Sequence, residues 1–446
     1  MKMSENRERY NFFRLDSCTE CGVCLSKCPV MRLPPPRAKQ EIRRLINGEK
    51  TDILRECTTC LSCDTYCPEN ADPYELILYR WYERYREKGL GQTMKLLSPN
   101  HPRNLWAALW KKFPEDERKT IQSWLNPKRS EVFMLGGSMT SLVPYLTHSK
   151  LLEDFSFTGT ADFWTCGALF YQLGLFDVVE QVGKRVEKQL EKLGAKKVIL
   201  FNEHEYIMLK KILPEKFGIK FDTELQCLEE WLLERIEKGD IKLKTKVNMK
   251  VTLHDSCWSK AIGPEFFDTS RKLIKATGAE LVEMQHCREN SLCCGFGAGA
   301  RRYSMLDIID YSRNRFKEAE QSHADALVVH CSGCLWILLV AKELLEVKMP
   351  VYHIFELVQM AAGEQPAHRH RERAWDIIGT VLAHPIANIV RTGKKYWIEP
   401  FPPEIEKTAV ELEDKSILPK LIGPILKWNL TRKLISIVFR IILSLR

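Results

Sequence analysis

The stretch "ADALVVHCSGCLWIL", residues 324–338, decides the fold that the sequence predicts. Its apolar start is typical of a buried strand, and the CxxC turn leads into an apolar segment that predicts a helix. The apolar run of residues 326–341 falls short of the roughly 20 residues that a membrane span needs. A strand, a cysteine turn and a helix in this order indicate part of a parallel α/β layer.

The same order of elements occurs twice, at an offset of roughly 120 to 130 residues, which is typical of a duplicated supersecondary unit. The corresponding pairs are "EVFMLGGSMTS" (131–141) with "VNMKVTLHDSCWSK" (247–260), "FWTCGALFYQLG" (163–174) with "ENSLCCGFGAGA" (289–300), and "AKKVILFNEHEYIML" (195–209) with residues 324–338. We therefore predict two copies of one α/β unit, each with its loops at one end of a parallel sheet.

The second copy carries five cysteines close to predicted strand ends: Cys257, Cys293, Cys294, Cys331 and Cys334. Because the ends of parallel strands converge at one edge of a sheet, we expect these five thiols to meet. A disulfide between neighbouring cysteines would be strained, and "GFGAG" lacks the Lys and Ser/Thr of a phosphate loop. A zinc site that uses four of the thiols stays open as an alternative.

Two cysteine motifs with the same spacing lie near the start of the chain. "CTECGVCLSKCP" (18–29) and "CTTCLSCDTYCP" (57–68) both read C-x2-C-x2-C-x3-C-P. This spacing is typical of two-cluster ferredoxins, in which the fourth cysteine of each motif binds the other cluster. Zinc knuckles are the alternative, which the doubled spacing disfavours. We predict one [4Fe–4S] cluster on Cys18, Cys21, Cys24 and Cys67, and a second on Cys57, Cys60, Cys63 and Cys28.

The segment between these motifs predicts helices, because Ile42 and Leu45 belong to an apolar pattern at helical spacing. Residues 74–88 ("YELILYRWYERYREK") predict another helix, whose aromatic side chains we expect in the core. Residues 1–91 thus predict a helical ferredoxin domain, and residues 92–128 predict a polar linker.

The composition limits the function classes further. The chain has 446 residues, 16 cysteines, 45% hydrophobic residues and a net charge of +9. Its start, "MKMSENRERYNFF" (1–13), lacks the apolar core of a signal peptide, so we expect an intracellular protein whose clustered cysteines serve metal or redox chemistry. The basic excess is too diffuse to indicate a nucleic-acid partner, and we expect none.

The Cys…CCG…CxxC pattern and its "HDSC" start (254–257) resemble the cysteine-rich (CCG) domain of heterodisulfide reductase catalytic subunits. Related domains occur in iron–sulfur subunits of lactate, glycolate and glycerol-3-phosphate oxidation systems, and the resemblance covers most of residues 15–360. Among these proteins, the chain also resembles the catalytic subunit of a sulfite-reduction-associated membrane complex. The resemblance implies a noncubane [4Fe–4S] cluster on Cys257, Cys293, Cys294, Cys331 and Cys334, with Gly295 allowing a close approach of the backbone.

The first copy departs from this pattern, because Ser138, Thr165, Cys166, Asn202 and Glu205 stand where the family has five cysteines. One thiol cannot hold such a cluster, since iron–sulfur assembly needs thiolates. We therefore expect the first copy to be structural and to shape the cleft, with Cys166 pointing toward it. A scheme with two noncubane clusters, which the resemblance implies for the full family, gives way to a one-cluster mechanism.

Four further residues near these motifs have open roles. His254 and His286 are each either a hydrogen-bonded structural histidine or a proton donor to a leaving thiolate. Cys227 and Cys287 are predicted to be small buried residues rather than ligands.

The C-terminal part has two different patterns. Residues 363–416 are mixed and charged, and predict a solvated loop region. Residues 417–446 predict an amphipathic helix, with a polar stripe of Asn429, Arg432, Lys433, Ser436, Arg440 and Ser444 and apolar residues elsewhere. Such a helix indicates binding to a membrane surface or to an integral membrane partner, and packing on its own domain is the alternative.

Together these patterns predict an α+β fold: a helical two-cluster ferredoxin domain, a duplicated α/β CCG domain and a C-terminal amphipathic helix. The predicted boundaries are 1–91 (ferredoxin domain), 92–128 (linker), 129–245 (degenerate first repeat), 246–362 (functional second repeat), 363–416 (extension) and 417–446 (helix).

The patterns and the resemblance predict an iron–sulfur oxidoreductase with the five cysteines of the second copy as its catalytic site. It would pass electrons between an integral membrane cytochrome or quinone-reactive subunit and a thiol/disulfide protein or cofactor, on the cytoplasmic side of the membrane. One alternative is a non-catalytic electron-transfer subunit of a flavin-dependent lactate, glycolate or glycerol-3-phosphate dehydrogenase. Another is a zinc-stabilised scaffold.

Overall fold

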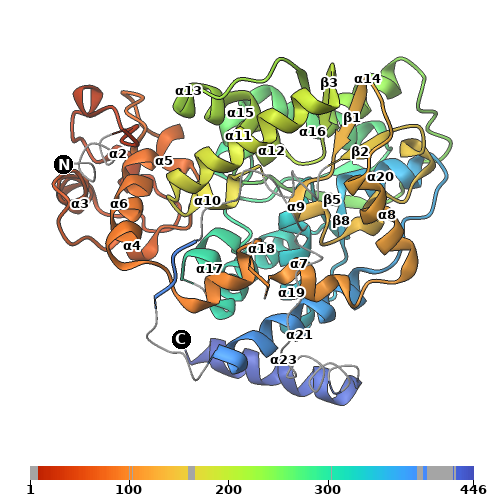
Figure 1. Ribbon diagram of the computed structural model, residues 1–446. Coiled ribbons are helices and arrows are strands. Elements are labelled where there is room, and N and C mark those ends of the chain that lie inside the picture. Colours follow the sequence, from red (N-terminus) through yellow and green to blue (C-terminus); the bar gives the residue numbers. More distant parts are fainter. Residues whose placement is uncertain are drawn as a thin grey trace.

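The structure is a computed structural model, and it describes residues 9–99, 101–102, 104–158, 166–302, 304–388, 395–398, 425 and 428–445. A helical N-terminal domain lies beside two α/β units, and the C-terminal helices run along the second unit (Figure 1). The predicted α+β class, with its two parallel sheets and C-terminal helix, is confirmed.

The N-terminal domain consists of short helices around the cysteine loops. Its elements are η1 (Leu15–Ser17), α2 (Val23–Ser26), α3 (Pro35–Ile46), α4 (Ile53–Glu56), α5 (Ser62–Thr65) and α6 (Pro73–Lys88). A proline begins both α3 and α6, where the missing N–H costs no helical hydrogen bond. The aromatic residues Tyr74, Trp81 and Tyr82 of α6 are buried, as predicted. Helices rather than a tight hairpin connect the two motifs, which confirms that prediction.

The two α/β units have the same topology, with four parallel strands each. The sheets have the orders β2-β1-β3-β4 and β6-β5-β7-β8. The strands are β1 (Val132–Leu135), β2 (Ser156–Thr158), β3 (Lys197–Leu200), β4 (Glu224–Cys227), β5 (Lys250–His254), β6 (Glu280–Leu281), β7 (Ala326–Val329) and β8 (Val351–His353). Corresponding strands take corresponding places, so the repeat read from the sequence is a structural repeat.

Helices connect the strands in both units, as parallel pairing requires. In the first unit they are α9 (Gly137–Thr140), η3 (Pro144–Thr147), η4 (Lys150–Leu152), α10 (Ala168–Gln172), α11 (Phe176–Leu193), α12 (Glu203–Ile207), the π-helical η5 (Met208–Ile212), α13 (Leu213–Phe217) and α14 (Leu228–Glu237). In the second they are α15 (Ser259–Ile262), α16 (Pro264–Ala276), η6 (Arg288–Asn290), α17 (Phe296–Arg302), α18 (Met305–Gln321), α19 (Ser332–Leu345) and α20 (Ile354–Ala361). Helix α19 follows β7 directly and is almost entirely buried, which explains its uniformly apolar sequence.

Two segments differ from the sequence predictions. The sequence predicts residues 92–128 as a polar linker and residues 363–416 as a solvated loop region, but both contain helices that pack against the rest of the protein. The predicted linker contains η2 (Gln92–Leu97), α7 (Leu105–Trp110) and α8 (Glu115–Leu125), and the predicted solvated loop region contains α21 (His370–Asn388). Helix α21 packs against α19 and α7 and buries Trp375. Its charged residue Arg373 is also buried, because it pairs with the buried Glu117 of α8 and lies 4.1 Å from the ring centroid of Phe113.

The C-terminal helix α23 (Asn429–Ser444) packs against α19 and α18. Part of its polar stripe faces the protein: the Ser436 hydroxyl donates to the carbonyl of Glu343, and Arg440 pairs with Glu346 at 2.8 Å. Leu430, Leu434 and Val438 point away from the protein and are 70%, 54% and 52% exposed. Among the described residues, no helix is long and apolar enough to cross a membrane.

Candidate metal centres

The first group of thiols consists of three cysteines of the first ferredoxin motif and the last cysteine of the second: Cys18, Cys21, Cys24 and Cys67. Burial and then the charges of Cys67, Cys21 and Cys18 raise the pKa of Cys24 to about 12, so these four thiols are close together. The backbone N–H of Ala71 donates to the Cys67 sulfur at 3.3 Å. The structure therefore brings together the four residues that the sequence assigns to one cluster.

The second group contains the other four cysteines of the motifs. Burial raises the pKa of Cys28, and the charge of Cys60 adds to this rise. The pKa of Cys63 is well above its usual value because of burial first, with contributions from Asp64, Cys57, Cys24 of the first group, and Cys60. Four clustered thiols, three of them buried, suit a soft metal centre, which would take them as thiolates.

Five cysteines of the second α/β unit meet at the carboxyl ends of β5 and β7. Side-chain hydrogen bonds between thiols connect them in the order Cys257, Cys293, Cys294, Cys334 and Cys331. Cys257 follows β5, the adjacent pair precedes α17, and the last two lie at the start of α19. The expected convergence of the strand ends thus places the five sulfurs in one continuous chain.

The CCG turn is shaped by backbone that passes very close to it. Gly295 has a φ of +107°, and a Cβ there would lie 2.3 Å from the carbonyl oxygen of Ile308. The N–H of Gly295 donates to the Cys293 sulfur at 3.3 Å. The pKa of Cys293 lies well below its usual value because of hydrogen bonds from Cys257 and then Cys294, so Cys293 is the most acidic thiol of the chain of five.

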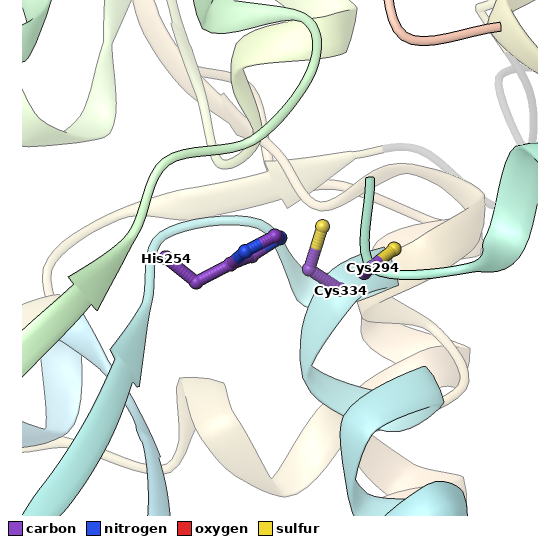
Figure 2. A group of neighbouring side chains, drawn as sticks. All are labelled: His254, Cys294 and Cys334. Atoms are coloured by element: carbon purple, nitrogen blue, oxygen red, sulfur yellow. The ribbon is translucent and has the colours of Figure 1, made fainter. Parts of the chain in front are cut away.

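His254 lies beside two of the five thiols, as Figure 2 shows. A nitrogen of its ring and the sulfurs of Cys294 and Cys334 lie within 4.8 Å of one another. Its Nδ1 accepts a hydrogen bond of 3.2 Å from the buried Arg315, so the ring proton belongs on Nε2. Burial, followed by the charge of Arg315, lowers the pKa of His254 well below its usual value, which makes a charged proton donor unfavourable.

The Nε2 atom of His254 provides a test of whether these residues fit a bound iron–sulfur cluster. It is buried and has no hydrogen-bond partner among the described residues. A buried N–H donor beside thiols suits a bound group with sulfur acceptors, and hydrogen bonds to sulfur are one of the ways in which proteins tune such clusters. The five thiols and this donor therefore fit an iron–sulfur group.

The first α/β unit forms the opposite wall of the same cavity. Its lining includes Ser138, Met139, Cys166, Ala168, Leu169, Gln172 and His204 from the first unit and the five cysteines from the second. Cys166 thus faces the cavity, as expected, and burial raises its pKa above the usual range. Thr165 lies outside the described residues.

Two first-unit residues that align with cysteines of the second unit, Asn202 and Glu205, support the CxxC turn through hydrogen bonds. The Asn202 side chain accepts a hydrogen bond of 2.8 Å from the N–H of Ser332, inside the CxxC turn. Glu205 accepts one of 3.3 Å from the N–H of Asn202, and burial holds its pKa well above the usual value. The first unit therefore has a structural role at this turn.

Two side chains of the first unit that the sequence did not single out lie against the cysteines. His204 Nδ1 is 3.8 Å from the Cys331 sulfur, and Gln172 Nε2 donates to the Cys257 sulfur at 3.8 Å. Burial lowers the pKa of His204 to about 3, so its ring is neutral near pH 7. In the repeat, His204 aligns with Gly333, between Cys331 and Cys334, so the cysteine pattern does not indicate it.

The remaining candidate residues have structural partners. His286 Nδ1 is 2.7 Å from a carboxylate oxygen of Glu318, and Arg32 contacts its Nε2 at 3.2 Å. Cys227 is fully buried at the start of α14. Cys287 is half-buried near the charges of Glu283 and Asp255.

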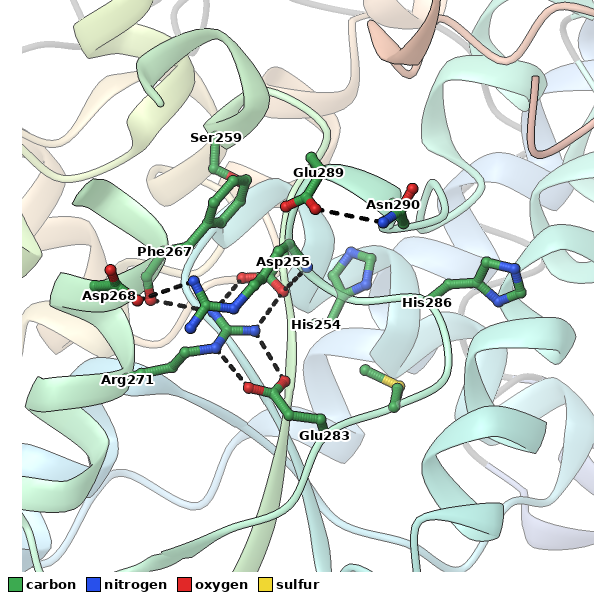
Figure 3. A network of polar contacts seen from close by, with 12 residues as sticks. His254, Asp255, Ser259, Phe267, Asp268, Arg271, Glu283, His286, Glu289 and Asn290 are labelled. Atoms are coloured by element: carbon green, nitrogen blue, oxygen red, sulfur yellow. Dashed lines mark hydrogen bonds and ion pairs between the residues drawn. The ribbon is translucent and has the colours of Figure 1, made fainter. Parts of the chain in front are cut away.

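A buried ion-pair network holds the loop that carries Cys257 (Figure 3). Arg271 of α16 donates to both carboxylate oxygens of Asp255, at 2.9 Å each, and to Glu283 at 2.6 and 2.9 Å. The N–H of Arg288 donates to Asp255 at 2.6 Å. Burial raises the pKa of Asp255, but the hydrogen bonds and charge of Arg271 outweigh it and keep that pKa below its usual value.

Replacement of Arg271 by Met is expected to lower the free energy of unfolding by about 3–5 kcal/mol, because it leaves the Asp255 carboxylate buried and unpaired. Denaturant titration followed by tryptophan fluorescence measures the change. The control is Arg43→Met, which breaks the surface pair with Glu20 and is expected to cost under about 1 kcal/mol. Equal losses in the two variants would contradict the account.

The second motif lies directly against the five-cysteine site. A Cβ at Gly297, on α17, would lie 2.1 Å from Thr59 Oγ1 and 2.3 Å from the carbonyl oxygen of Thr58. Both threonines lie between Cys57 and Cys60. The tyrosine of the same motif, Tyr66, donates to Asn290 at 2.6 Å. The second group of thiols is therefore the one that adjoins the five cysteines.

Comparison with known proteins agrees with both cysteine regions. The chain matches the family of the cysteine-rich domain (CCG) over residues 251–338 and that of the 4Fe-4S dicluster domain over residues 14–71. The dicluster domain implies two cubane clusters.

Curated relatives extend the similarity over most of the chain. One subunit of the dihydromethanophenazine:CoB–CoM heterodisulfide reductase of Methanosarcina mazei is 27% identical over 414 residues, covering 81% of this chain and 97% of that protein. One subunit of the fumarate reductase (CoM/CoB) of Methanothermobacter marburgensis is 26% identical over 378 residues, with coverages of 79% and 73%. EtfAB:quinone oxidoreductase of Syntrophomonas wolfei is 24% identical over 341 residues, with coverages of 71% and 42%. The chain is therefore similar to this heterodisulfide reductase subunit, and it matches the dicluster and CCG domain families in its two cysteine regions.

Proposed function

We propose that this protein passes electrons between a membrane quinone or cytochrome partner and a thiol/disulfide substrate that reacts at the five-cysteine site. The observation that carries the proposal is the close packing of the second cysteine motif against the CCG helix at Gly297. An electron carrier held by that motif would adjoin the site of sulfur chemistry. The similarity to a heterodisulfide reductase subunit supports the same conclusion.

The cofactors proposed are two cubane [4Fe–4S] clusters on the eight motif cysteines and one noncubane [4Fe–4S] cluster on the five cysteines. The noncubane cluster, when bound, would supply single-electron transfer and Lewis acidity next to a substrate sulfur. Cys257, Cys293, Cys294, Cys331 and Cys334 would hold it, because their sulfurs form one continuous chain. The neutral ring of His254 would donate a hydrogen bond from its Nε2–H to the bound sulfur atoms and keep the proton.

Residues of the first unit would form the substrate wall of the cavity. Gln172 and His204 hold Cys257 and Cys331 from this side, and Cys166 faces the same space. Cleavage of a disulfide consumes two electrons and two protons and yields two thiols, and the reverse reaction releases them. The buried wall excludes bulk water, which limits side reactions of the thiols.

Electron counting on the full protein tests this proposal. The anaerobic protein is reduced chemically, freed of reductant and mixed with a disulfide. We expect two thiols to form for every two electrons withdrawn, and we expect Cys293→Ser to withdraw none. Oxidation of the protein without thiol formation would contradict the proposal.

We further propose that the substrate is a small protein with a cysteine disulfide or trisulfide. The resemblance to the catalytic subunit of a sulfite-reduction-associated membrane complex supports this substrate class. The cavity lies between two α/β units and is lined mainly by buried residues, so a projecting protein segment could reach it where a globular surface could not. Rates with a small disulfide and with a disulfide on a flexible peptide arm distinguish the two substrate classes.

The similarity to EtfAB:quinone oxidoreductase supports a second candidate function, in which the protein only transfers electrons for a flavin dehydrogenase. In that case a reduced flavoprotein would reduce all centres of the chain, and a disulfide would not reoxidise them. The five-thiol cavity favours the first function, because a pure carrier needs no wall of buried polar side chains facing its cluster.

We also propose that the outer face of α23 lies on a lipid surface. Trp428, Leu430, Leu434, Val438 and Ile441 form this face, and all are more than half exposed. The helix has no acidic residue, and Lys433 is exposed on it. An apolar face with flanking basic residues is typical of helices that lie in the plane of an anionic membrane. The protein would then meet its electron partner at the cytoplasmic side of the membrane.

The double variant Leu434→Glu/Val438→Glu is expected to reduce binding to anionic phospholipid vesicles at least tenfold, because each burial contributes about 1.5–3 kcal/mol. Vesicle flotation measures the bound fraction. The control, Ser444→Glu, adds a charge at an exposed polar position and should bind nearly as well as the wild type. Binding of the wild type to native membranes but not to pure lipid would instead assign the face to a membrane protein.

A further inference from the structure

Lys260 joins the second cysteine motif to the CCG turn. It lies on α15, three residues after Cys257. Its ammonium donates to the carbonyl oxygen of Cys60 at 3.1 Å, to Ser62 Oγ at 2.7 Å and to the carbonyl oxygen of Ser291 at 2.8 Å. The first two partners belong to the second motif, and Ser291 lies two residues before Cys293. One side chain therefore holds both groups of thiols.

The charge of Lys260 is not neutralised where it lies. Its three hydrogen-bond partners are neutral oxygens, and no carboxylate of the described residues forms an ion pair with it. The side chain is half-buried, so solvent screens the charge only in part. A partly buried cation between two groups of thiols acts on the charge of both.

The contacts with Ser62 and with the carbonyl oxygen of Ser291 place the same cation beside both cysteine loops. It therefore favours negative charge in the second motif and at the five-cysteine site.

We propose that Lys260 is a positioning residue that raises the reduction potentials of both adjoining centres and keeps them matched for electron transfer. Reduction adds an electron to a cluster, and a nearby cation stabilises the added negative charge. For the second-motif cluster the inference rests on the dicluster domain, and for the five-cysteine centre it rests on the proposed function.

Redox titration of the anaerobic full-length protein, followed by EPR, tests this role. In Lys260→Met we expect the ratio of reduced to oxidised second-motif cluster to fall about tenfold at a fixed ambient potential, equal to about 59 mV for one electron. The five-cysteine centre should shift in the same direction. The cluster proposed on Cys18, Cys21, Cys24 and Cys67 is the internal reference and should not shift.

Three further variants separate charge from structure. Lys260→Arg should keep wild-type potentials, and Lys260→Gln, which keeps hydrogen-bond donors but loses the charge, should shift like Lys260→Met. Lys342→Met removes a lysine that donates to two carbonyl oxygens at the far end of α19, and should leave every potential unchanged. Wild-type potentials in Lys260→Gln, or equal shifts at all three centres, would overturn the proposal.

The outcome is also distinguishable from failure of the proposed function. If disulfides never reoxidise the wild-type protein, the proposed function fails, whereas a shift of the second-motif cluster in Lys260→Gln still supports the role of Lys260. If Lys260→Met loses iron, the arginine and glutamine variants decide the question, because both retain a long polar side chain.

Discussion

Replacement of Cys294 by Ser is expected to remove the five-cysteine centre and all disulfide turnover, while both ferredoxin clusters remain. Cys294 lies in the middle of the chain of thiols, in contact with Cys293 and Cys334, so its loss divides the site into two separate pairs of thiols. Iron analysis should show a fall from about twelve to about eight atoms per chain, since each [4Fe–4S] cluster holds about four.

The matched control is Cys227→Ser. Cys227 is a buried cysteine at the N-cap of α14, a position that serine also satisfies well. It should keep about twelve iron atoms per chain and wild-type turnover. Unchanged iron in Cys294→Ser, or zinc in place of iron in the wild type, would contradict the proposed centre.

Replacement of Gly297 by Ala is expected to slow electron transfer from the second motif to the five-cysteine site at least tenfold, without loss of iron. The new Cβ would lie 2.3 Å from the backbone oxygen of Thr58, so the cysteine loop and α17 must move apart. Displacements of about 1 Å at a reacting site can cost about 10²-fold in rate. Rapid mixing with a reductant, followed by absorption and freeze-quench EPR, measures the step.

Gly239→Ala is the control for the added methyl group, because nothing lies within 4 Å of a Cβ built there. It should transfer electrons at the wild-type rate. Equal rates in Gly297→Ala and the wild type would show that the contact between Thr58 and α17 does not set the distance between the two centres.

The repeat and the convergence of the cysteines could be predicted because both depend on local patterns. The central strands β1, β3, β5 and β7 are short and mainly apolar runs, and the five cysteines lie just after β5, just before α17 or at the start of α19. Parallel pairing then places the strand ends at one edge of the sheet, and this does not depend on how the other segments pack. The α+β class therefore followed from the sequence.

The helices α8 and α21 could not be predicted, because their charged residues find partners far away in the sequence. Arg373 reads as a solvated residue of a charged segment, yet it is buried against Glu117. Arg369 pairs with the same glutamate at 2.9 Å. Only the tertiary structure shows that such charges are compensated.

The orientation of the C-terminal helix also could not be predicted from the sequence. An amphipathic pattern normally buries the apolar face, but in α23 Ser436 and Arg440 face the protein and Leu430 and Leu434 face outward. The roles of His204 and Gln172 were missed for a related reason. Both come from the unit without the cysteine set, and only the packing of the two units brings them to Cys331 and Cys257.

The most direct test of the central claim is EPR of the anaerobic protein, titrated with thiols under oxidation. We expect a paramagnetic signal that appears only with thiol, persists in Cys227→Ser and is absent in Cys294→Ser. Spectra that do not change with thiol, while the two ferredoxin clusters titrate normally, would contradict substrate chemistry at the five-cysteine site and would favour an electron-transfer role.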